Sequence, residues 1–513
     1  MKVLDSNYSR NIEQRSIGNG ISLLNLMDNA GKSVSAFIKD YLVDVNDKNG
    51  RIVILCGKGN NGGDGFVIAS DILNVINNIT VILVDGKPKT SDALHMFEKL
   101  KNTNIEIIEY TESAKIEKVI GEADIIVDAI YGIGFRGKIN ENISKIIDIV
   151  NNSKAKVVSV DIPSGMCCDT GIIENDFIRP DYTITFTNLK PVHVLFPSSD
   201  YCGNVLVRDV GIPEYIVDSS ESVMNVIDRQ LVKESLPEFL NSANKRDRGR
   251  LFSLCSSIGM PGASIMAAKA ALRTGVGLLE LAVLRENYNI VTSHLLEPVF
   301  TVLDSKDGIT YSFDEKEKIL NSIFKATACL IGCGLGISSD TEKIVCEVIK
   351  NSSVPIVIDA DGINIVSKNI SILKKALSTI ILTPHPGEMA RLIGTTATEV
   401  QRDRYNIAKR FSIENNVVLV LKGANTIVAL PDGKVYVNLT GNDGLAKGGS
   451  GDVLAGMMSS FLAQGLSAEK AACCSVYLHG LSGDMCRNKY SKAFMLPTDV
   501  VNELYKLFLE IKC

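Results

Sequence analysis

The chain has 513 residues, of which 45% are hydrophobic and 22% charged, and its net charge is −5. Because single cores stop growing near about 250–300 residues, this length predicts at least two domains. The composition is that of a globular protein, and the lack of a basic run excludes nucleic acid as an expected partner. The start shows no signal-peptide pattern, and no apolar run reaches the roughly 18–20 residues of a membrane span, so we expect a cytoplasmic protein without membrane contact. The twelve cysteines are scattered without a zinc signature, so we expect free thiols.

The first half of the chain alternates short apolar runs with helical patterns. The runs at 51–56, 80–84, 105–108, 124–130 and 156–161 predict strands. Helical spacing at 22–41, 66–76, 92–101, 112–121 and 143–150 predicts the helices among them. This order is typical of a parallel sheet with helices on both faces, which is a three-layer Rossmann-like α/β domain. The carboxyl ends of its strands then form the edge at which ligands bind.

A second alternating series follows a polar break around 211–213 and 218–221. Strands are predicted at 251–255, 329–331, 355–358, 380–382 and 417–421, and helices at 262–272 and from Asp452. The segments 426–429 and 434–437 flank a Pro-Asp-Gly turn and predict a hairpin. We therefore expect two α/β domains, at 1–215 and 226–513. Since the halves show no sequence similarity, the chain is interpreted as a fusion rather than a duplication.

A glycine-rich segment, 57–65 (GKGNNGGDG), joins the first predicted strand to a helix. Such a loop exposes backbone N–H groups, and the helix N-terminus favours a phosphate there. Two later strands end in Asp128 and Asp161, and each is followed by a loop rich in glycine or serine. One such aspartate is most often a structural brace. Three polar loops at successive strand ends instead favour a binding site.

These three motifs resemble the NAD(P)H-hydrate epimerase family, in order and spacing, over about residues 11–213. The resemblance implies that Asp161 lies at the reacting nicotinamide ring as an acid/base, with a second such group left unidentified. It implies a potassium ion bound by Asn61, Asp128 and Ser164, whose oxygens suit a hard cation. The residues implied to hold hydrated NADH or NADPH are Asn60, Asn61, Gly62, Gly63, Asp64, Gly132, Ile133, Gly134, Phe135, Arg136, Gly137, Lys138 and Asp161.

The most informative segment of the second half is 440–452, which ends in GGSGD before a helix of small and apolar residues. Its glycines predict an anion site at the helix N-terminus, and Asp452 would take a proton from an attacking hydroxyl. The plainer interpretation is an aspartate-capped helix after a flexible loop. Four further motifs at predicted strand ends favour the site: 331–336 (IGCGLG), 359–361 (DAD), 383–388 (TPHPGE) and 422–426 (KGANT).

Together these motifs resemble the NAD(P)H-hydrate dehydratase family, which has a ribokinase-like fold, over about residues 243–505. The resemblance implies that ADP, with Mg²⁺, phosphorylates the ring hydroxyl of the hydrated dinucleotides NADHX and NADPHX before phosphate leaves. The sequence alone does not decide between ADP and ATP. We expect a homo-oligomer, and the sequence does not determine its number of subunits. The implied hydrate ligands are Ala263, Gly336, His385 and Asp452, and the implied adenine-nucleotide ligands are Lys422, Gly423, Ala424, Asn425, Thr426 and Gly451.

The sequence departs from the dehydratase pattern at 244–246 (NKR), at Cys333, where proline is usual, and at Lys447, where threonine is common. We interpret Lys447 as a solvated surface charge rather than a phosphate contact. The alternative function is a small-molecule kinase of the ribokinase superfamily fused to a non-catalytic nucleotide-binding module. The intact motif residues of the first half argue against that alternative.

Overall fold

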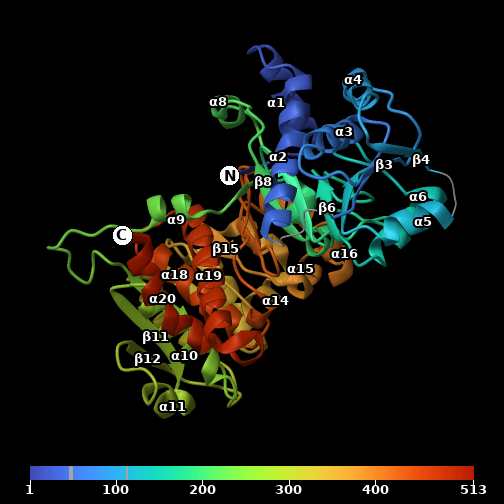
Figure 1. Ribbon diagram of the computed structural model, residues 1–513. Helices are drawn as coiled ribbons and strands as arrows, with labels where there is room; N and C mark the ends of the chain where they lie inside the picture. The colour runs from blue at the N-terminus through green and yellow to red at the C-terminus, as the bar shows by residue number, and fades with distance from the viewer. Residues whose placement is uncertain (45–49, 111–113, 513) are drawn as a thin grey trace. The chain divides into compact units, whose positions relative to one another are not determined.

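The computed structural model describes residues 1–44, 50–110 and 114–512. The chain separates into two compact units, Met1–Met224 and Asn225–Cys513. The division falls inside the segment that sequence analysis left between its two domains, and residues 216–224 go with the first unit. Figure 1 shows the N-terminal unit in blue to green and the C-terminal unit in green to red.

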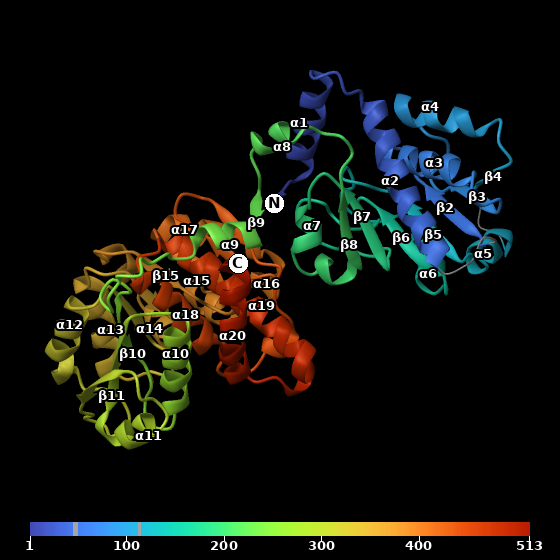
Figure 2. The same cartoon turned by 60° about the vertical axis from the view of Figure 1, so that its left-hand side comes forward.

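A parallel sheet forms the centre of the N-terminal unit, with the order β4-β3-β2-β5-β6-β7-β8. The order reverses beside β2, so the loops that follow β2 and β5 leave the sheet side by side, where open α/β sheets bind ligands. Figure 2 shows the strands of this unit with α2 beside them. The strands are β2 (Ile52–Cys56), β3 (Ile79–Leu83), β4 (Glu106–Glu109), β5 (Ile125–Ala129), β6 (Lys156–Val160), β7 (Tyr182–Phe186) and β8 (Asn204–Arg208).

Helices cover both faces of this sheet, which confirms the predicted three-layer α/β architecture. In β2, Ile52, Ile54 and Cys56 pack under one helical layer, whereas Val53 and Leu55 pack under the other. The first layer holds α2 (Leu23–Asp44), α3 (Asn60–Ile72) and α4 (Ser91–Leu100), and the second holds α5 (Ala114–Gly121) and α6 (Glu141–Asn151). Residues 112–113 of the predicted fourth helix lie outside the described residues. The unit also contains α1 (Ser6–Ile17) and two short helices, α7 (Pro191–Val194) and α8 (Glu214–Asp218).

The helix after the glycine-rich segment begins at Asn60, six residues before the predicted start at residue 66. Glycine is unfavourable in helix interiors, so the low helix propensity of this segment predicted a later helix start than the structure shows. Packing overrides that preference, because a Cβ on Gly62 would lie 2.0 Å from the carbonyl oxygen of Gly57. A Cβ on Gly63 would lie 2.6 Å from the sulfur of Met27. These glycines therefore let α3 start directly against β2 and α2.

The C-terminal unit contains a mixed sheet with the order β9-β18-β17-β16-β15-β14-β13-β10-β11-β12. The predicted hairpin is confirmed, since β17 pairs antiparallel with β16 and with β18. Sequence analysis missed β11 and β12, which extend the sheet beyond β10. The strands are β9 (Met224–Val226), β10 (Arg250–Leu254), β11 (Leu278–Leu284), β12 (Val299–Leu303), β13 (Ala328–Ile331), β14 (Ile356–Ile358), β15 (Ile380–Leu382), β16 (Val418–Leu421), β17 (Ile427–Ala429) and β18 (Val435–Val437).

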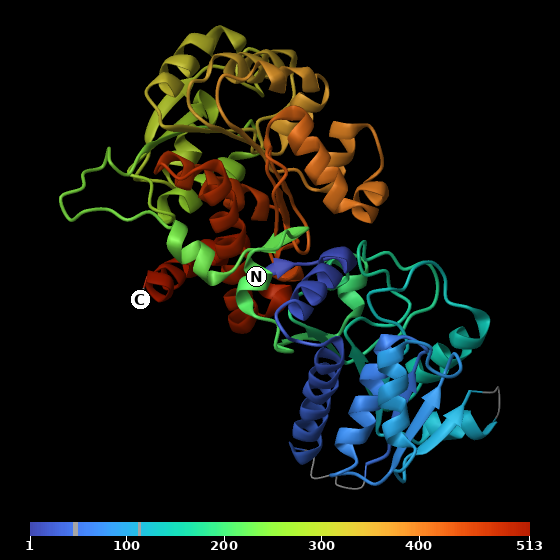
Figure 3. The same ribbon diagram turned by 90° about the horizontal axis from the view of Figure 1, so that it is seen from above.

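Two groups of helices lie on opposite sides of this sheet (Figure 3). The first shares one buried apolar cluster and consists of α10 (Pro261–Arg273), α18 (Ser450–Ala463), α19 (Ala468–Phe494) and α20 (Pro497–Lys512). The second includes α12 (Lys316–Phe324), α13 (Ser339–Asn351), α14 (Asp361–Ser367), α15 (Pro386–Ile393) and α17 (Arg404–Asn415). Small residues bring α18 close to α10, since a Cβ on Gly456 would lie 2.2 Å from the carbonyl oxygen of Ala267. Among the described residues, no helix is long and apolar enough to cross a membrane.

Candidate active sites

A cavity of about 740 Å³ opens in the N-terminal unit where the loops after β2 and β5 meet. This volume is typical of pockets for small ligands, which span about 300–1,000 Å³. Gly62, Gly63, Gly137 and Lys138 are not among the residues that line it. The other predicted dinucleotide residues do line it: Asn60, Asn61, Asp64, Gly132, Ile133, Gly134, Phe135, Arg136 and Asp161.

Asp161 follows β6 at the wall of this cavity and forms a buried ion pair. The Lys190 ammonium donates to its Oδ1 at 2.6 Å, and the Thr185 hydroxyl donates to the same oxygen at 2.8 Å. Lys190 also donates to the Thr185 hydroxyl at 2.7 Å and to the Phe186 carbonyl at 3.0 Å. Burial opposes ionisation, but the Lys190 ammonium holds the pKa of Asp161 below its usual range. Asp161 is therefore a carboxylate at neutral pH.

The backbone of Asp161 is also held in an unusual conformation. Its φ of +63° lies in the left-handed region, which a residue with a Cβ adopts at a cost of about 1–3 kcal/mol. His193 Nδ1 accepts from the Lys190 N–H at 3.0 Å, so His193 Nε2 is the nitrogen that donates to the Asp161 carbonyl, also at 3.0 Å. Burial lowers the pKa of His193 to about 4, so the ring is neutral. These contacts fix both the position and the charge of the Asp161 carboxylate.

Two more carboxyl groups line the cavity, those of Glu13 on α1 and Asp64 on α3. Burial raises the pKa of each, and the negative charge of Asp161 raises both further. Sequence analysis assigned no role to Glu13 or Lys190. Lys190 follows β7, a strand that was not predicted, so nothing placed this lysine at the ligand edge of the sheet.

Asp128 is fully buried in β5 and is surrounded by neutral donors. Its carboxylate accepts from the Ser159 hydroxyl at 2.7 Å, from the Ser164 N–H at 2.9 Å and from the Ser164 hydroxyl at 2.5 Å. In the described ranges no Lys, Arg or His forms an ion pair with it, and burial raises its pKa. The side-chain amide nitrogen of Asn61 is buried without a partner, and its amide oxygen lies beside Gly132. The structure thus brings Asp128 and Ser164 into contact and places Asn61, in the first turn of α3, beside the loop that follows β5.

In the C-terminal unit, the GGSGD segment forms the start of α18. Gly449 occupies the N-cap with a φ of +100°, and the Ser450 N–H bonds to the Lys447 carbonyl at 3.2 Å. The next N–H groups of a helix have no acceptor within the helix, so they attract anions. Asp452 lies in this first turn and is half-buried. Burial, and then repulsion from Asp359, raises the pKa of Asp452 to about 6.

Lys422 lies beneath this first turn and pairs with Asp359. Its ammonium donates to Asp359 Oδ1 at 2.7 Å, and the Thr383 hydroxyl donates to the same oxygen at 2.7 Å. A Cβ on Gly451 would lie 3.3 Å from the Lys422 nitrogen, so the ammonium faces the helix start. Burial opposes ionisation of Asp359, but Lys422 holds its pKa below the usual range.

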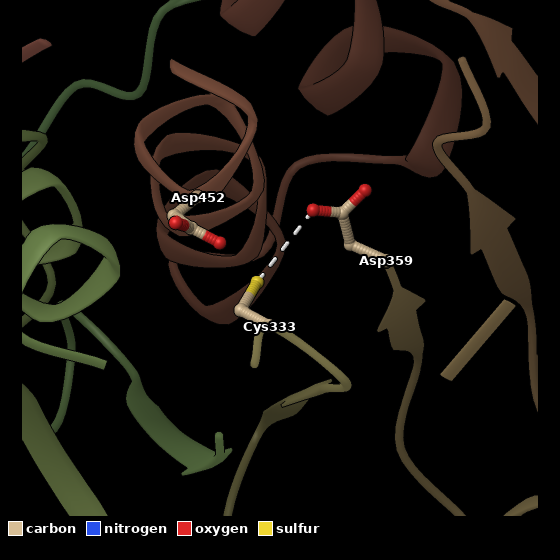
Figure 4. A group of neighbouring side chains, drawn as sticks. All are labelled: Cys333, Asp359 and Asp452. Atoms are coloured by element: carbon tan, nitrogen blue, oxygen red, sulfur yellow. Dashed lines mark hydrogen bonds between the residues drawn. The ribbon is translucent and has the colours of Figure 1, made fainter. Parts of the chain in front are cut away.

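Cys333 lies between the two aspartates, as Figure 4 shows. Its sulfur is 3.6 Å from Asp359 Oδ2, and one ligand atom each of Cys333, Asp359 and Asp452 lie within 4.8 Å of one another. A hydrogen bond with Cys255, together with burial, raises the pKa of the Cys333 thiol. The residue that replaces the usual proline is therefore a neutral thiol inside the site.

The other predicted nucleotide residues follow strands of the same sheet. Gly336, after β13, has a φ of +75° and donates its N–H to Asp361 Oδ2 at 2.9 Å. His385, after β15, caps α15 by accepting from the Gly387 N–H at 3.0 Å, and its ring is half-exposed. Ala263 lies in the first turn of α10, after β10. The segment 422–426 follows β16, with the Thr426 hydroxyl donating to the Gly423 carbonyl at 2.9 Å.

The interpretation of Lys447 as a solvated charge is wrong. Its ammonium donates to the backbone carbonyls of Ala493 at 2.7 Å and Met495 at 2.6 Å. Lys447 thereby ties the loop before α18 to the end of α19. The two carbonyl acceptors are far from Lys447 in the sequence, so no local sequence pattern indicated that Lys447 contacts them.

Comparisons with known proteins identify both halves of the chain. The family model described as YjeF-related protein N-terminus matches residues 23–192, and that of NAD(P)H-hydrate dehydratase matches residues 252–506. The bifunctional NAD(P)H-hydrate repair enzyme of Moorella thermoacetica is 35% identical, with 93% of this chain and 91% of that protein covered. The Escherichia coli enzyme of the same name is 32% identical, with 95% of this chain and 90% of that protein covered.

A solved structure is also similar to the C-terminal part. It is the ADP/ATP-dependent NAD(P)H-hydrate dehydratase from Bacillus subtilis, co-crystallised with ATP and Mg²⁺. The identity is 28% and the TM-score 0.50, with 56% of this chain and 99% of that chain covered. With two matching domains in this order and near full-length similarity to named relatives, the chain belongs to the family of bifunctional NAD(P)H-hydrate repair enzymes.

Proposed function

We propose that this chain repairs hydrated NADH and NADPH in two steps. The N-terminal unit interconverts the R and S epimers, and the C-terminal unit dehydrates the S epimer with ADP and releases AMP and phosphate. The observation that carries the proposal is the near full-length similarity to bifunctional repair enzymes. The positions of Asp161 and Asp452, one in each unit at a sheet edge formed by glycine-rich loops, support it.

In the dehydration step, Asp452 acts as the general base. The substrate hydroxyl attacks the terminal phosphorus of ADP, the bond between phosphorus and the bridging oxygen breaks, and AMP leaves. Asp452 takes the proton of the attacking hydroxyl, and the N–H groups at the start of α18 stabilise the charge on the transferred phosphoryl group. The new phosphate ester is a better leaving group than hydroxyl. Phosphate then departs with the C–O electron pair, and loss of a proton from the neighbouring carbon re-forms the ring double bond.

We propose that Mg²⁺ binds together with the nucleotide and not to a complete set of protein ligands. Mg²⁺ prefers about six oxygen ligands and often keeps several waters. The cluster of Cys333, Asp359 and Asp452 fits it poorly, because one ligand is sulfur and Asp359 is already bound by Lys422. When bound, Mg²⁺ would neutralise the phosphates of the nucleotide. Lys422 supplies a fixed positive charge next to the same phosphate site.

For the epimerase unit, we propose that the cavity holds the hydrated dinucleotide with its nicotinamide ring beside Asp161. The first turn of α3, which carries Asn60, and the loop 132–138 would receive its phosphates, since both lie at the ligand edge of the sheet. A potassium ion bound by Asp128, Ser164 and Asn61 fits the residues present. Asp128 is a buried acidic group without a cationic partner in the described part of the chain, and the neighbouring donors are oxygens. The ion would supply the positive charge that keeps Asp128 from repelling the phosphates.

One experiment tests the whole proposal. A mixture of both epimers of hydrated NADH is incubated with the full chain and ADP, and the absorbance band of the reduced nicotinamide is followed. We expect both epimers to be consumed completely, whereas a chain without epimerase activity would consume the S epimer and leave the R epimer. No recovery with ADP or ATP would contradict the dehydratase assignment. Phosphorylation of a vitamin or sugar alcohol in its place would identify a small-molecule kinase.

We further propose that the enzyme works in the cytoplasm as a homo-oligomer. Phe494 on α19 and Leu509 on α20 are 80% and 63% exposed, and their helices pack together. Large exposed apolar side chains are typical of subunit interfaces. Light scattering of the purified chain measures its molar mass, and a value of one chain would contradict the oligomer.

A further inference from the structure

We propose that Asp64 is the second proton-transfer residue of the epimerase, which donates a proton to the leaving hydroxyl while Asp161 accepts one from the returning water. The inference rests on the proposed function of the N-terminal unit and names a catalytic group within its cavity. Asp64 and Asp161 come from different strand ends, since Asp64 lies in α3 after β2 and Asp161 follows β6. Both line the same cavity.

The chemistry requires two groups in opposite protonation states. Water added to the ring double bond of a reduced nicotinamide places the hydroxyl on the carbon next to the ring nitrogen. An acid protonates this hydroxyl, the C–O bond breaks with its electron pair on oxygen, and the nitrogen lone pair forms a C=N bond. Water then adds to the other face of that carbon, a base removes its proton, and the π pair returns to nitrogen. The acid has lost one proton and the base has gained one, and no oxidant or reductant takes part.

The position of Asp64 suits the role of the acid. Asp64 lines the cavity, and no hydrogen bond to its carboxyl group is found in the described part of the chain. The helix that carries it is fixed against the sheet, because a Cβ on Gly65 would lie 2.6 Å from the Cys56 sulfur. The same helix turn is fixed by Gly62, which packs on the carbonyl of Gly57. A carboxyl group on a rigid element at the wall of a ligand cavity is suited to repeated proton transfer.

The charges around Asp64 favour its protonated form. Asp161 and Glu13 face it from neighbouring elements, and Cys56 lies beneath it. The nearby cations have other partners, since Lys190 is bound to Asp161 and Arg10 interacts with Glu13. Burial and the two negative neighbours raise the pKa of Asp64 well above its usual range. Two carboxyl groups whose environments push their pKa values apart form a natural acid and base pair.

The test uses the full-length chain without ADP, so that the dehydratase is idle. One purified epimer of hydrated NADH is added, and chromatography follows formation of the other at pH values from about 4 to 10. We expect the rate to fall on the alkaline side of this range, and this alkaline limb belongs to Asp64. D64N is expected to slow epimerisation by about 10²–10⁴-fold and to remove the alkaline limb. D64E should keep the alkaline limb at a reduced rate, because glutamate also carries a transferable proton. This result would show that D64N loses activity through the missing proton and not through misfolding.

Two further variants separate catalysis from structure. D71N places the same change on the same helix outside the cavity, where Asp71 pairs with Lys39, and it should keep the wild-type profile. E13Q removes one negative neighbour of Asp64, so the alkaline limb should move to lower pH while remaining present. A wild-type profile in D64N, or loss of the limb in E13Q with its retention in D64N, overturns the proposal. A wild-type chain that epimerises nothing would instead overturn the proposed function of this unit.

Discussion

Replacing Lys190 with methionine removes the positive charge that holds Asp161. The methionine stem occupies nearly the same volume, so the change isolates the ammonium group. The side chains of Lys190 and Asp161 are only 5% and 11% exposed, so water does not replace the lost partner. The variant leaves Asp161 with the Thr185 hydroxyl and leaves the Phe186 carbonyl without its lysine donor.

The expected loss of stability follows from this burial. Breaking a buried ion pair by removing one partner costs about 3–5 kcal/mol, because the remaining charge stays out of water. In the wild type the pKa of Asp161 is lowered, so the pair stabilises the fold above about pH 4, the unfolded pKa of aspartate, and this contribution is lost as pH falls through the folded pKa. In Lys190→Met the folded pKa of Asp161 rises instead. The difference in stability between the two proteins should therefore shrink as the pH is lowered.

Amide hydrogen exchange of β6 and β7 measures the local free energy of unfolding around Asp161. The double variant Lys190→Met/Asp161→Asn carries no uncompensated charge and should be more stable than Lys190→Met alone. Lys156→Met is the matched control: its pair with Asp181 is 48% and 35% exposed and should contribute only about 0–1 kcal/mol. A loss below about 1 kcal/mol in Lys190→Met, or strict additivity in the double variant, would refute the reasoning.

Three further predictions concern single residues. Asp452→Asn should slow ADP-dependent dehydration by about 10²–10⁴-fold and leave epimerisation unchanged, and a variant with near wild-type dehydration would exclude Asp452 as the base. In the wild type, the dehydration rate should rise as the pH increases through about 6, where Asp452 ionises. Asp128→Ala should lose both epimerisation and potassium dependence, measured against potassium after exchange into a large organic cation; a wild type indifferent to potassium would leave Asp128 as a structural brace. Cys333, which is fully buried and whose thiol pKa is raised, should react with iodoacetamide at neutral pH far more slowly than half-buried Cys167, and mass spectrometry showing equal labelling would contradict a buried, protonated thiol.

The sequence predicted the ligand edges of both sheets because local chemistry marks them. Asp128 and Asp161 end apolar strands, and glycines crowd the turns that follow, so each motif indicates its own place at an edge. No local sequence pattern identifies the side chains that surround these residues in the structure. Lys190 follows β7, a short strand of alternating residues that a search for continuous apolar runs missed, and Glu13 lies on α1 outside the predicted sheet. Asp359 and Lys422 pair across 63 residues of sequence, and only the parallel order of β14, β15 and β16 brings them together.

Both units use the same arrangement of charges on unrelated motifs. In one, Lys190 and Thr185 bind a single oxygen of Asp161, and in the other Lys422 and Thr383 bind a single oxygen of Asp359. Each lysine holds its aspartate ionised, and each ionised aspartate raises the pKa of a second carboxyl group nearby, Asp64 or Asp452. Because a proton moves most readily to or from a group whose pKa is close to the working pH, the fixed ion pair tunes its neighbour for proton transfer. Loss of either lysine should therefore alter the pH dependence of its own unit and leave the other reaction unchanged.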